Sequence, residues 1–281
     1  MSNSPLQPLD NIIQIEIENI VGKEATVGGE IVEKLDKFDQ QVRNYYLSLE
    51  SSRLRVFNEF MSLFCLLIIS IGLEIPLFIP KFKRNTPVQQ VLDASASGSY
   101  RNLKVAYNLL LGGYVSEMHA IMRMVEQWLE CAVIIEGNPS VAEHILKNGA
   151  YKLPNNVLQR AIKSSQDLKT LYTGMKKTFG KLSERAHVTK TSFDLSKITG
   201  TEGPFIKTGI ISDQVFHKDA GGLAHMAGNA LNIYLRHFKA VPTNWAKKYN
   251  EVKNDLIKIS VISPKKDLRE ALCPTNTNGN H

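Results

Sequence analysis

The chain has 281 residues, of which 43% are hydrophobic and 22% are charged. These fractions are ordinary for a globular protein and argue against a chain that is disordered throughout. The three cysteines, Cys65, Cys131 and Cys273, lie far apart and form no CxxC pair. Their placement argues against a disulfide framework and a cysteine zinc site, and it indicates a reducing, cytoplasmic compartment. The N-terminal residues lack a basic segment followed by an apolar one, so we expect no secretory signal.

The formal net charge of +7 is unevenly placed along the chain. Residues 147–190 contain ten basic residues and two acidic ones, whereas residues 1–60 contain six basic and ten acidic ones. A basic segment of this kind indicates a polyanion partner such as RNA, DNA or a membrane surface. It is equally compatible with a solvated face, or with a face that docks on the acidic N-terminal part of the same chain.

Three segments of the N-terminal region are defined by their periodicity or by their lack of it. Residues 12–21 alternate apolar and polar side chains like a strand, although a helix also fits their spacing. Residues 30–55 have the three-and-four spacing of a helix. Residues 85–99 are polar and small, and we expect them to form a connection.

The most apolar stretch is residues 60–79, which is about long enough to span a bilayer. Glu74 and Pro76 interrupt it, and this favours a buried core helix over residues 56–72. We expect Gly72 and Pro76 to end that helix. A membrane-anchored protein that uses this stretch is the alternative.

The segment from Leu103 to Gly137 is predicted to be the central helix of the fold. Its apolar arc is wide enough to pack on two sides, as in the middle of a bundle. Gly112 and Gly113 either break this helix or allow a neighbour to approach closely. A polar strip covers the rest of its surface: Ser116, His119, Arg123, Glu126, Gln127 and Glu130. The strip is either a solvent-facing surface with local ion pairs or an Arg–Glu pair that points into an interior pocket.

The remaining chain completes an all-α fold. We expect a helical bundle of six to eight helices with a small irregular or β insert near residues 189–216, which is a candidate lid. The predicted division is an N-terminal helical region over 1–100, a helical core domain over 101–262 and a disordered tail over 263–281. The expected C-terminal elements are a short helix over 140–148, a long helix over 157–187, a small-residue helix over 219–239 and an amphipathic helix over 245–262.

A motif joins the central helix to the long helix that follows it. Arg123 and Glu126 have R-x-x-E spacing, and Leu182, Ser183 and His187 have L-S-x-x-x-H spacing. Over residues 103–189 the chain resembles a group of poorly characterised all-helical bacterial and archaeal proteins with this signature, loosely grouped with the HEPN nucleotide-binding and ribonuclease superfamily. The resemblance implies a helical protein that acts on nucleic acid or binds a nucleotide, with defence or toxin-type roles, or else it implies the fold alone.

The candidate catalytic residues are therefore Arg123, Glu126, Ser183 and His187. In this hypothesis His187 is the general acid or base, Arg123 binds a phosphate or stabilises developing negative charge, Glu126 orients one of them, and Ser183 donates a hydrogen bond. The alternative is a buried polar network that only joins two core helices.

The basic stripe of the long helix supplies the candidate nucleic-acid-binding residues, Lys163, Lys177, Lys181 and Arg185. No P-loop, dinucleotide fingerprint or HExxH pattern is present, and we expect no metal and no cofactor. The expected partner is RNA or a nucleotide, a homodimer is compatible with the sequence, and membrane association is the less favoured alternative. The competing function is a non-enzymatic helical scaffold or binding protein.

Overall fold

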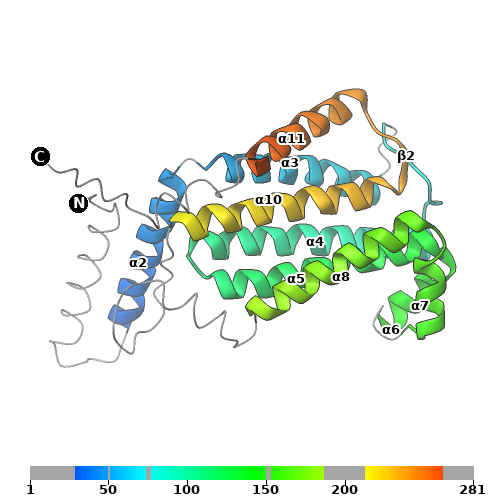
Figure 1. The fold of residues 1–281 in the computed structure, drawn as a ribbon, viewed down its shortest axis with the longest axis horizontal. Coiled ribbons are helices and arrows are strands. Elements are labelled where there is room, and N and C mark those ends of the chain that lie inside the picture. Colours follow the sequence, from blue (N-terminus) through cyan, green and yellow to red (C-terminus); the bar gives the residue numbers. More distant parts are fainter. Residues whose placement is uncertain (1–28, 50, 74–76, 150–152, 187–212, 262–281) are drawn as a thin grey trace, which may run out of the picture.

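A computed structural model of the chain describes residues 29–49, 51–73, 77–149, 153–186 and 213–261. Within these residues the fold is the all-α bundle that the sequence predicts, with one small two-stranded sheet (Figure 1). The elements in chain order are α2 (Gly29–Ser48), α3 (Ser52–Gly72), β1 (Ile79–Pro80), α4 (Pro87–Leu111), α5 (Val115–Gly137), the 3-10 turn η1 (Pro139–Val141), α6 (Ala142–Asn148), α7 (Asn155–Ile162), α8 (Gln166–Ala186), α10 (Asp213–Leu235), β2 (Phe238–Ala240) and α11 (Thr243–Val261).

The apolar helix α3 is a core helix that packs against α4, α10 and α11. It ends at Gly72, as predicted, and about half of its apolar window is buried inside the protein. The helix expected over residues 30–55 is two helices, because α2 ends at Ser48 and α3 begins at Ser52. The ten buried residues of α3 are Leu54, Val56, Phe57, Phe60, Met61, Leu63, Phe64, Leu67, Ser70 and Ile71.

Helix α4 corrects the prediction that residues 85–99 form a connection. Thr86 caps its N-terminus through a hydrogen bond from the Gln89 amide, and Pro87 occupies the first turn, where a missing N–H costs nothing. Four of the small residues of this stretch, Ser95, Ala96, Gly98 and Ser99, are buried, and Gly98 lies against the indole of Trp128. A Cβ at Gly98 would approach that ring to 2.5 Å, so the small side chains allow α4 and α5 to pack closely.

The predicted central helix is divided into α4 and α5 at the two glycines. Gly113 has φ 75°, a left-handed conformation that glycine adopts without strain. The short turn makes α4 and α5 antiparallel neighbours in the middle of the bundle (Figure 1). The domain boundary expected after residue 100 therefore falls inside α4, and the core is continuous across it because α3 packs on α10.

The C-terminal half contains a second break that was not predicted. The single helix predicted over residues 157–187 is two helices, α7 and α8, in its described part, which ends at Ala186. Ser165 accepts a hydrogen bond from the Leu168 amide at the start of α8. The final helix, α11, matches its prediction closely. The sheet pairs Ile79 of β1 with Ala240 of β2, whereas the insert predicted near 189–216 falls almost wholly outside the described residues. The segments 12–21 and 263–281 also lie outside them.

Candidate functional site

Helices α5 and α8 pack against each other through the polar strip of α5. The contacts run in opposite order along the two chains, so the helices are antiparallel: Glu130 meets Tyr172, Arg123 meets Phe179, and His119 meets Arg185. His119 and Glu126 are buried, and Arg123 and Glu130 are half-buried. The strip is therefore neither a simple solvent face nor a single ion pair, and we call it the polar seam.

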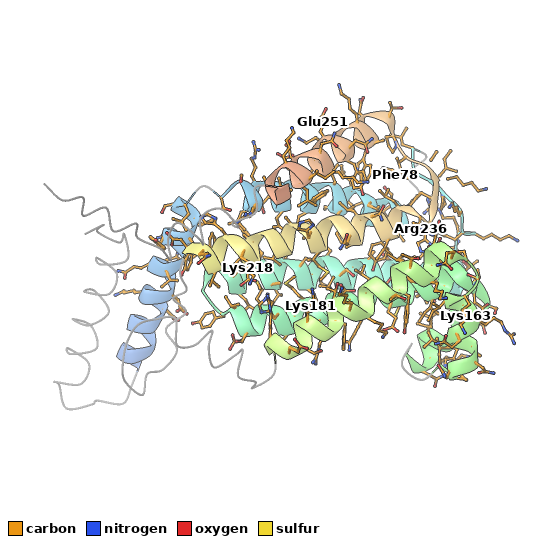
Figure 2. All side chains as sticks on the ribbon, in the orientation of Figure 1. Phe78, Lys163, Lys181, Lys218, Arg236 and Glu251 are labelled. Atoms are coloured by element: carbon orange, nitrogen blue, oxygen red, sulfur yellow. The ribbon has the colours of Figure 1, made fainter. Side chains whose placement is uncertain are left out.

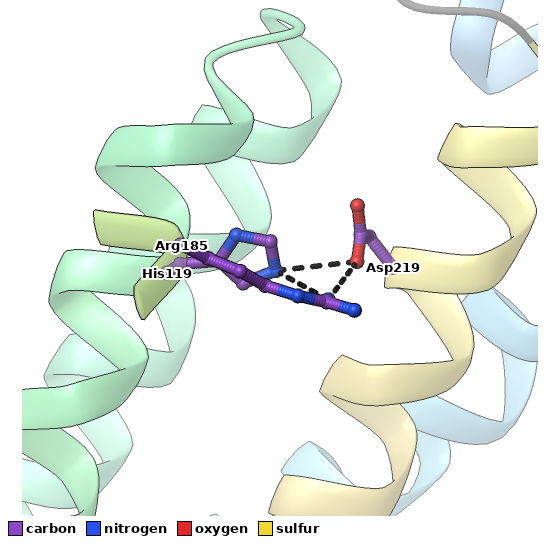
Figure 3. Close-up of polar contacts among 3 residues, drawn as sticks. All are labelled: His119, Arg185 and Asp219. Atoms are coloured by element: carbon purple, nitrogen blue, oxygen red, sulfur yellow. Dashed lines mark hydrogen bonds and ion pairs between the residues drawn. The ribbon is translucent and has the colours of Figure 1, made fainter. Parts of the chain in front are cut away.

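At one end of the polar seam three helices contribute one charged cluster, which Figure 3 shows in close-up. One carboxylate oxygen of Asp219 in α10 is contacted by both His119 of α5 and Arg185 of α8. The His119 Nε2 to Asp219 Oδ1 distance is 3.2 Å, and the Arg185 Nη1 to Asp219 Oδ1 distance is 3.4 Å. The His119 and Asp219 side chains are 2% and 6% exposed, whereas Arg185 is 33% exposed.

The geometry selects one tautomer of His119. A carboxylate oxygen only accepts hydrogen bonds, so the contact with Asp219 is attractive when Nε2 carries the hydrogen. The Arg185 guanidinium has only hydrogen-bond donors, so it cannot bond to Nε2 when that atom carries a hydrogen. Its Nη1 therefore donates to Asp219, although it also lies 3.3 Å from Nε2. The Nδ1 atom of His119 is buried and has no hydrogen-bond partner among the described residues. The cluster thus ties α5, α8 and α10 together without presenting a solvent-accessible base.

Glu126 lies further along the polar seam and is the second buried titratable residue of α5. It is 5% exposed, and its Oε2 atom has no hydrogen-bond partner in the described part of the chain. Burial, reinforced by the nearby Glu130 carboxylate, raises the pKa of Glu126 to about 7, while Lys176 opposes the shift. Near neutral pH this carboxyl exchanges between its protonated and ionised forms.

The other end of the polar seam is a fully paired network. The Tyr172 hydroxyl donates to Glu130 Oε1 at 2.8 Å, and Lys176 Nζ lies 2.9 Å from the same carboxylate. Burial and the hydrogen bond to Glu130 both raise the pKa of the Tyr172 hydroxyl, which keeps it protonated. Lys176 also lies over the rings of Tyr172 and Phe179, at 5.1 and 5.7 Å from their centroids. These contacts fix the position of α8 on α5.

The outward side of α8 and its neighbour α7 is basic. Lys163, Lys177 and Lys181 are exposed, as the sequence predicts for a nucleic-acid-binding face. In Figure 2 the labelled Lys163 and Lys181 lie at the two ends of the α7–α8 layer. Arg185 was assigned to the same face, but its guanidinium contacts Asp219 and is only partly exposed. We define the basic face as Lys163, Lys169, Lys177 and Lys181.

Two glycines lie within the basic face, at Gly174 and Gly180. A Cβ built at either position would have no atom within 4 Å, so neither glycine is required by packing inside the protein. Glycine in a helix interior costs about 1 kcal/mol relative to alanine. Packing inside the protein does not explain why these two exposed positions are glycine. The absence of a side chain there is consistent with close approach of an external ligand.

The predicted catalytic residues are only partly brought together. Arg123 and Glu126 lie on the polar seam, where the Arg123 guanidinium is 5.5 Å from the centroid of the Phe179 ring. Ser183 is half-buried on α8, one turn beyond Phe179. His187 lies outside the described residues, so the proposed acid–base role of this residue stays a prediction.

The sequence reasoning missed the two most buried members of the charged cluster. His119 was placed on the polar strip but not in the site, and Asp219 was seen only as the start of a small-residue helix. Asp219 lies three residues after Phe216 and four before Leu223, both fully buried, and this spacing puts it on the apolar face of α10. An acid at such a position signals a buried partner.

No family model, curated protein or solved structure matches the chain. In the described part of the sequence no group of three or more His, Cys, Asp or Glu side chains is arranged to hold a metal ion. The candidate site is therefore defined by its geometry alone: the polar seam, the His119–Arg185–Asp219 cluster and the outward basic face of α7 and α8.

Proposed function

We propose that this protein binds RNA through the basic face of α7 and α8. The observation that best supports this is the run from Leu168 to Ser183, which contains four lysines and no acidic residue. Lys169, Lys177 and Lys181 are exposed, and within the described ranges none of the three is held in an ion pair. Their charges are available to phosphate groups, the main source of affinity in nucleic-acid binding.

The composition of this surface favours a nucleic acid over a membrane. Within residues 153–186 no large hydrophobic side chain is exposed, so nothing on this side would insert into a bilayer. The open glycines, Gly174 and Gly180, would let a phosphate backbone approach the helix closely. The resemblance to HEPN-like proteins favours RNA over DNA.

The polar seam has a positioning role in this proposal. It fixes α8 on α5 through Glu130 and Arg123, and on α10 through Arg185, so that the lysines form a rigid surface. The acceptor atom of His119 and the free oxygen of Glu126 are buried, which gives a substrate no route to them. We therefore assign binding to this surface and no catalytic step.

The test is RNA binding by the full chain, measured by fluorescence anisotropy with a labelled single-stranded RNA. The Lys177→Ala/Lys181→Ala variant is expected to bind at least about tenfold more weakly at moderate salt. The matched control is Lys247→Ala/Lys253→Ala, which removes two exposed lysines from α11 and should leave affinity almost unchanged. Equal loss in both variants, or no binding by the native chain, would overturn the proposal. Tighter binding of a matched DNA would reassign the partner.

A further inference from the structure

The exposed hydrophobic side chains of the described residues are concentrated in one place. Ten large hydrophobic residues are more than a third exposed, and five of them lie between Leu66 and Ile79. These five are Leu66, Ile69, Leu73, Leu77 and Ile79, with exposed fractions of 50%, 37%, 62%, 67% and 49%. Scattered exposed leucines are ordinary, but half of the total within one short segment is a surface feature.

The first three residues lie along the exposed side of α3 and its C-terminal end. Leu66 and Ile69 are three residues apart on the helix, and Leu73 is the residue that caps it, with its amide bonded to the Ile69 carbonyl. The opposite side of the same helix contacts α10 and α4. Leu77 and Ile79 follow the helix in the sequence, and the Arg84 hydrogen bonds to the Ile71 and Leu73 carbonyls hold the segment that follows β1 at the same end of α3. Residues 74–76 lie outside the described ranges, and the surface is defined without them.

Basic residues adjoin these apolar residues. Lys81 and Lys83 are exposed directly after β1, and the pairing of Ile79 with Ala240 brings the exposed Lys239 beside them. In Figure 2 the labelled Phe78 lies at the same end of the molecule as the sheet. Arg84 is held by its hydrogen bonds to the Ile71 and Leu73 carbonyls. Among the described residues, the carboxylate of Asp93 lies close to Gly72 at the end of α3.

We propose that this apolar tip, Leu66, Ile69, Leu73, Leu77 and Ile79 with Lys81, Lys83 and Lys239, docks the protein on an anionic lipid surface. Apolar side chains that enter the headgroup region, next to lysines that meet lipid phosphates, are the usual chemistry of reversible interfacial binding. The surface lies on a different part of the molecule from the basic face, and the proposal does not depend on RNA binding.

The packing of α3 favours attachment to the lipid surface over a transmembrane helix. A bilayer span would have to withdraw the fully buried Phe57, Phe64 and Leu67 from the core, whereas the tip residues are already exposed. The charge of the tip also decides against a second copy of the chain. A two-fold contact through this surface would bring Lys81 and Lys83 of both copies into one interface, where like charges repel.

The experiment is flotation of the purified full chain with lipid vesicles, either of phosphatidylcholine alone or with about 30% phosphatidylserine. The native chain should float with the anionic vesicles only, and moderate salt should release it. Leu73→Ser/Leu77→Ser is expected to lower the bound fraction about tenfold, and Lys81→Ala/Lys83→Ala should do the same. All replaced residues are exposed, so the melting temperature should stay within a degree or two of the native value.

Two matched variants separate this surface from others. Leu47→Ser replaces another exposed leucine, near the end of α2, and should float like the native chain. Lys177→Ala/Lys181→Ala should also float normally, which distinguishes failure of this proposal from failure of RNA binding. The proposal is overturned if the native chain does not float, if only the α8 variant loses flotation, if alkaline carbonate fails to release the chain, or if Leu73→Ser/Leu77→Ser dissociates a dimer.

Discussion

His119 of α5 donates its Nε2 hydrogen to Asp219 of α10 across 3.2 Å, and both side chains are almost completely buried. Arg185 of α8 contacts the same carboxylate oxygen from the partly exposed side. Three helices that are far apart in the sequence are therefore fixed by one acidic residue. A buried charge of this kind stabilises the fold only while its partners are present.

Asp219→Asn tests that relationship. The amide keeps the shape of the side chain but removes the charge, so Arg185 loses its ionic partner and His119 loses a charged hydrogen-bond acceptor. We expect the free energy of unfolding to fall by about 2–4 kcal/mol in urea denaturation. Asp255→Asn is the control, because Asp255 pairs with the exposed Lys258 on the same helix and should cost less than about 0.5 kcal/mol. Equal effects in the two variants would show that the cluster contributes nothing special.

Glu126→Gln tests the burial of the Glu126 carboxyl through the pH dependence of the free energy of unfolding. The folded chain holds the Glu126 proton up to a pKa of about 7, whereas the ordinary value is 4.5. Since the folded state binds the proton more tightly, stability falls as pH rises from the lower value to the higher one and is level above it. A shift of this size corresponds to about 3 kcal/mol at most.

The glutamine variant carries no charge and escapes this loss. Its stability relative to the native chain should therefore rise by up to about 3 kcal/mol between pH 4.5 and pH 8. Urea denaturation at a series of pH values measures the difference directly. The exposed Glu117, also on α5, gives the control variant Glu117→Gln, for which a flat difference is expected. If the stability difference between Glu126→Gln and the native chain also does not change with pH, the Glu126 carboxyl is exposed to water.

Gly98→Ala tests the close contact between α4 and α5. The added methyl would meet the Trp128 ring at 2.5 Å, so the helices must separate or the indole must shift. We expect a loss of about 1–3 kcal/mol in the free energy of unfolding. Gly222→Ala in α10 is the matched control, because a Cβ at that position meets nothing within 4 Å and alanine favours the helix. A neutral Gly98→Ala variant would contradict the packing described.

Gly174→Ala/Gly180→Ala tests whether packing inside the protein requires the two glycines of α8. Both positions are open, so the double variant should gain about 1–2 kcal/mol in stability, as judged by thermal and urea unfolding. If instead the variant is destabilised, these glycines have a structural role in the protein itself. The bulkier Gly180→Gln should remain as stable as the native chain and bind RNA more weakly.

The sequence predicts the long helices well because their apolar spacing is regular. It does not predict that α2 ends at Ser48 or that α7 ends at Ile162, because neither glycine nor proline follows these residues closely. At the break between α7 and α8 the Ser165 hydroxyl accepts the Leu168 amide hydrogen, but a single serine is a weak signal in a sequence. The first half of α4 was assigned to a connection because small polar residues resemble a loop, whereas here they allow contact with Trp128.

The site was less predictable than the fold for a physical reason. What the polar strip of α5 faces depends on α8, which packs against it through contacts such as Tyr172 with Glu130, 42 residues apart in the sequence. Periodicity identifies a face but not the element that covers it. Asp219 shows the same limit, since its burial follows from α10 facing α5, although its place among apolar residues was visible.

The central claim, that the basic face binds RNA phosphates, is tested most directly by salt dependence. The slope of log Kd against log salt counts the phosphate contacts, at about 0.7 per contact for a single strand. For Lys177→Ala/Lys181→Ala the slope should be smaller than the native slope by about 1.4, whereas Lys247→Ala/Lys253→Ala should keep the native slope. Identical slopes for the native chain and the Lys177→Ala/Lys181→Ala variant would contradict the account.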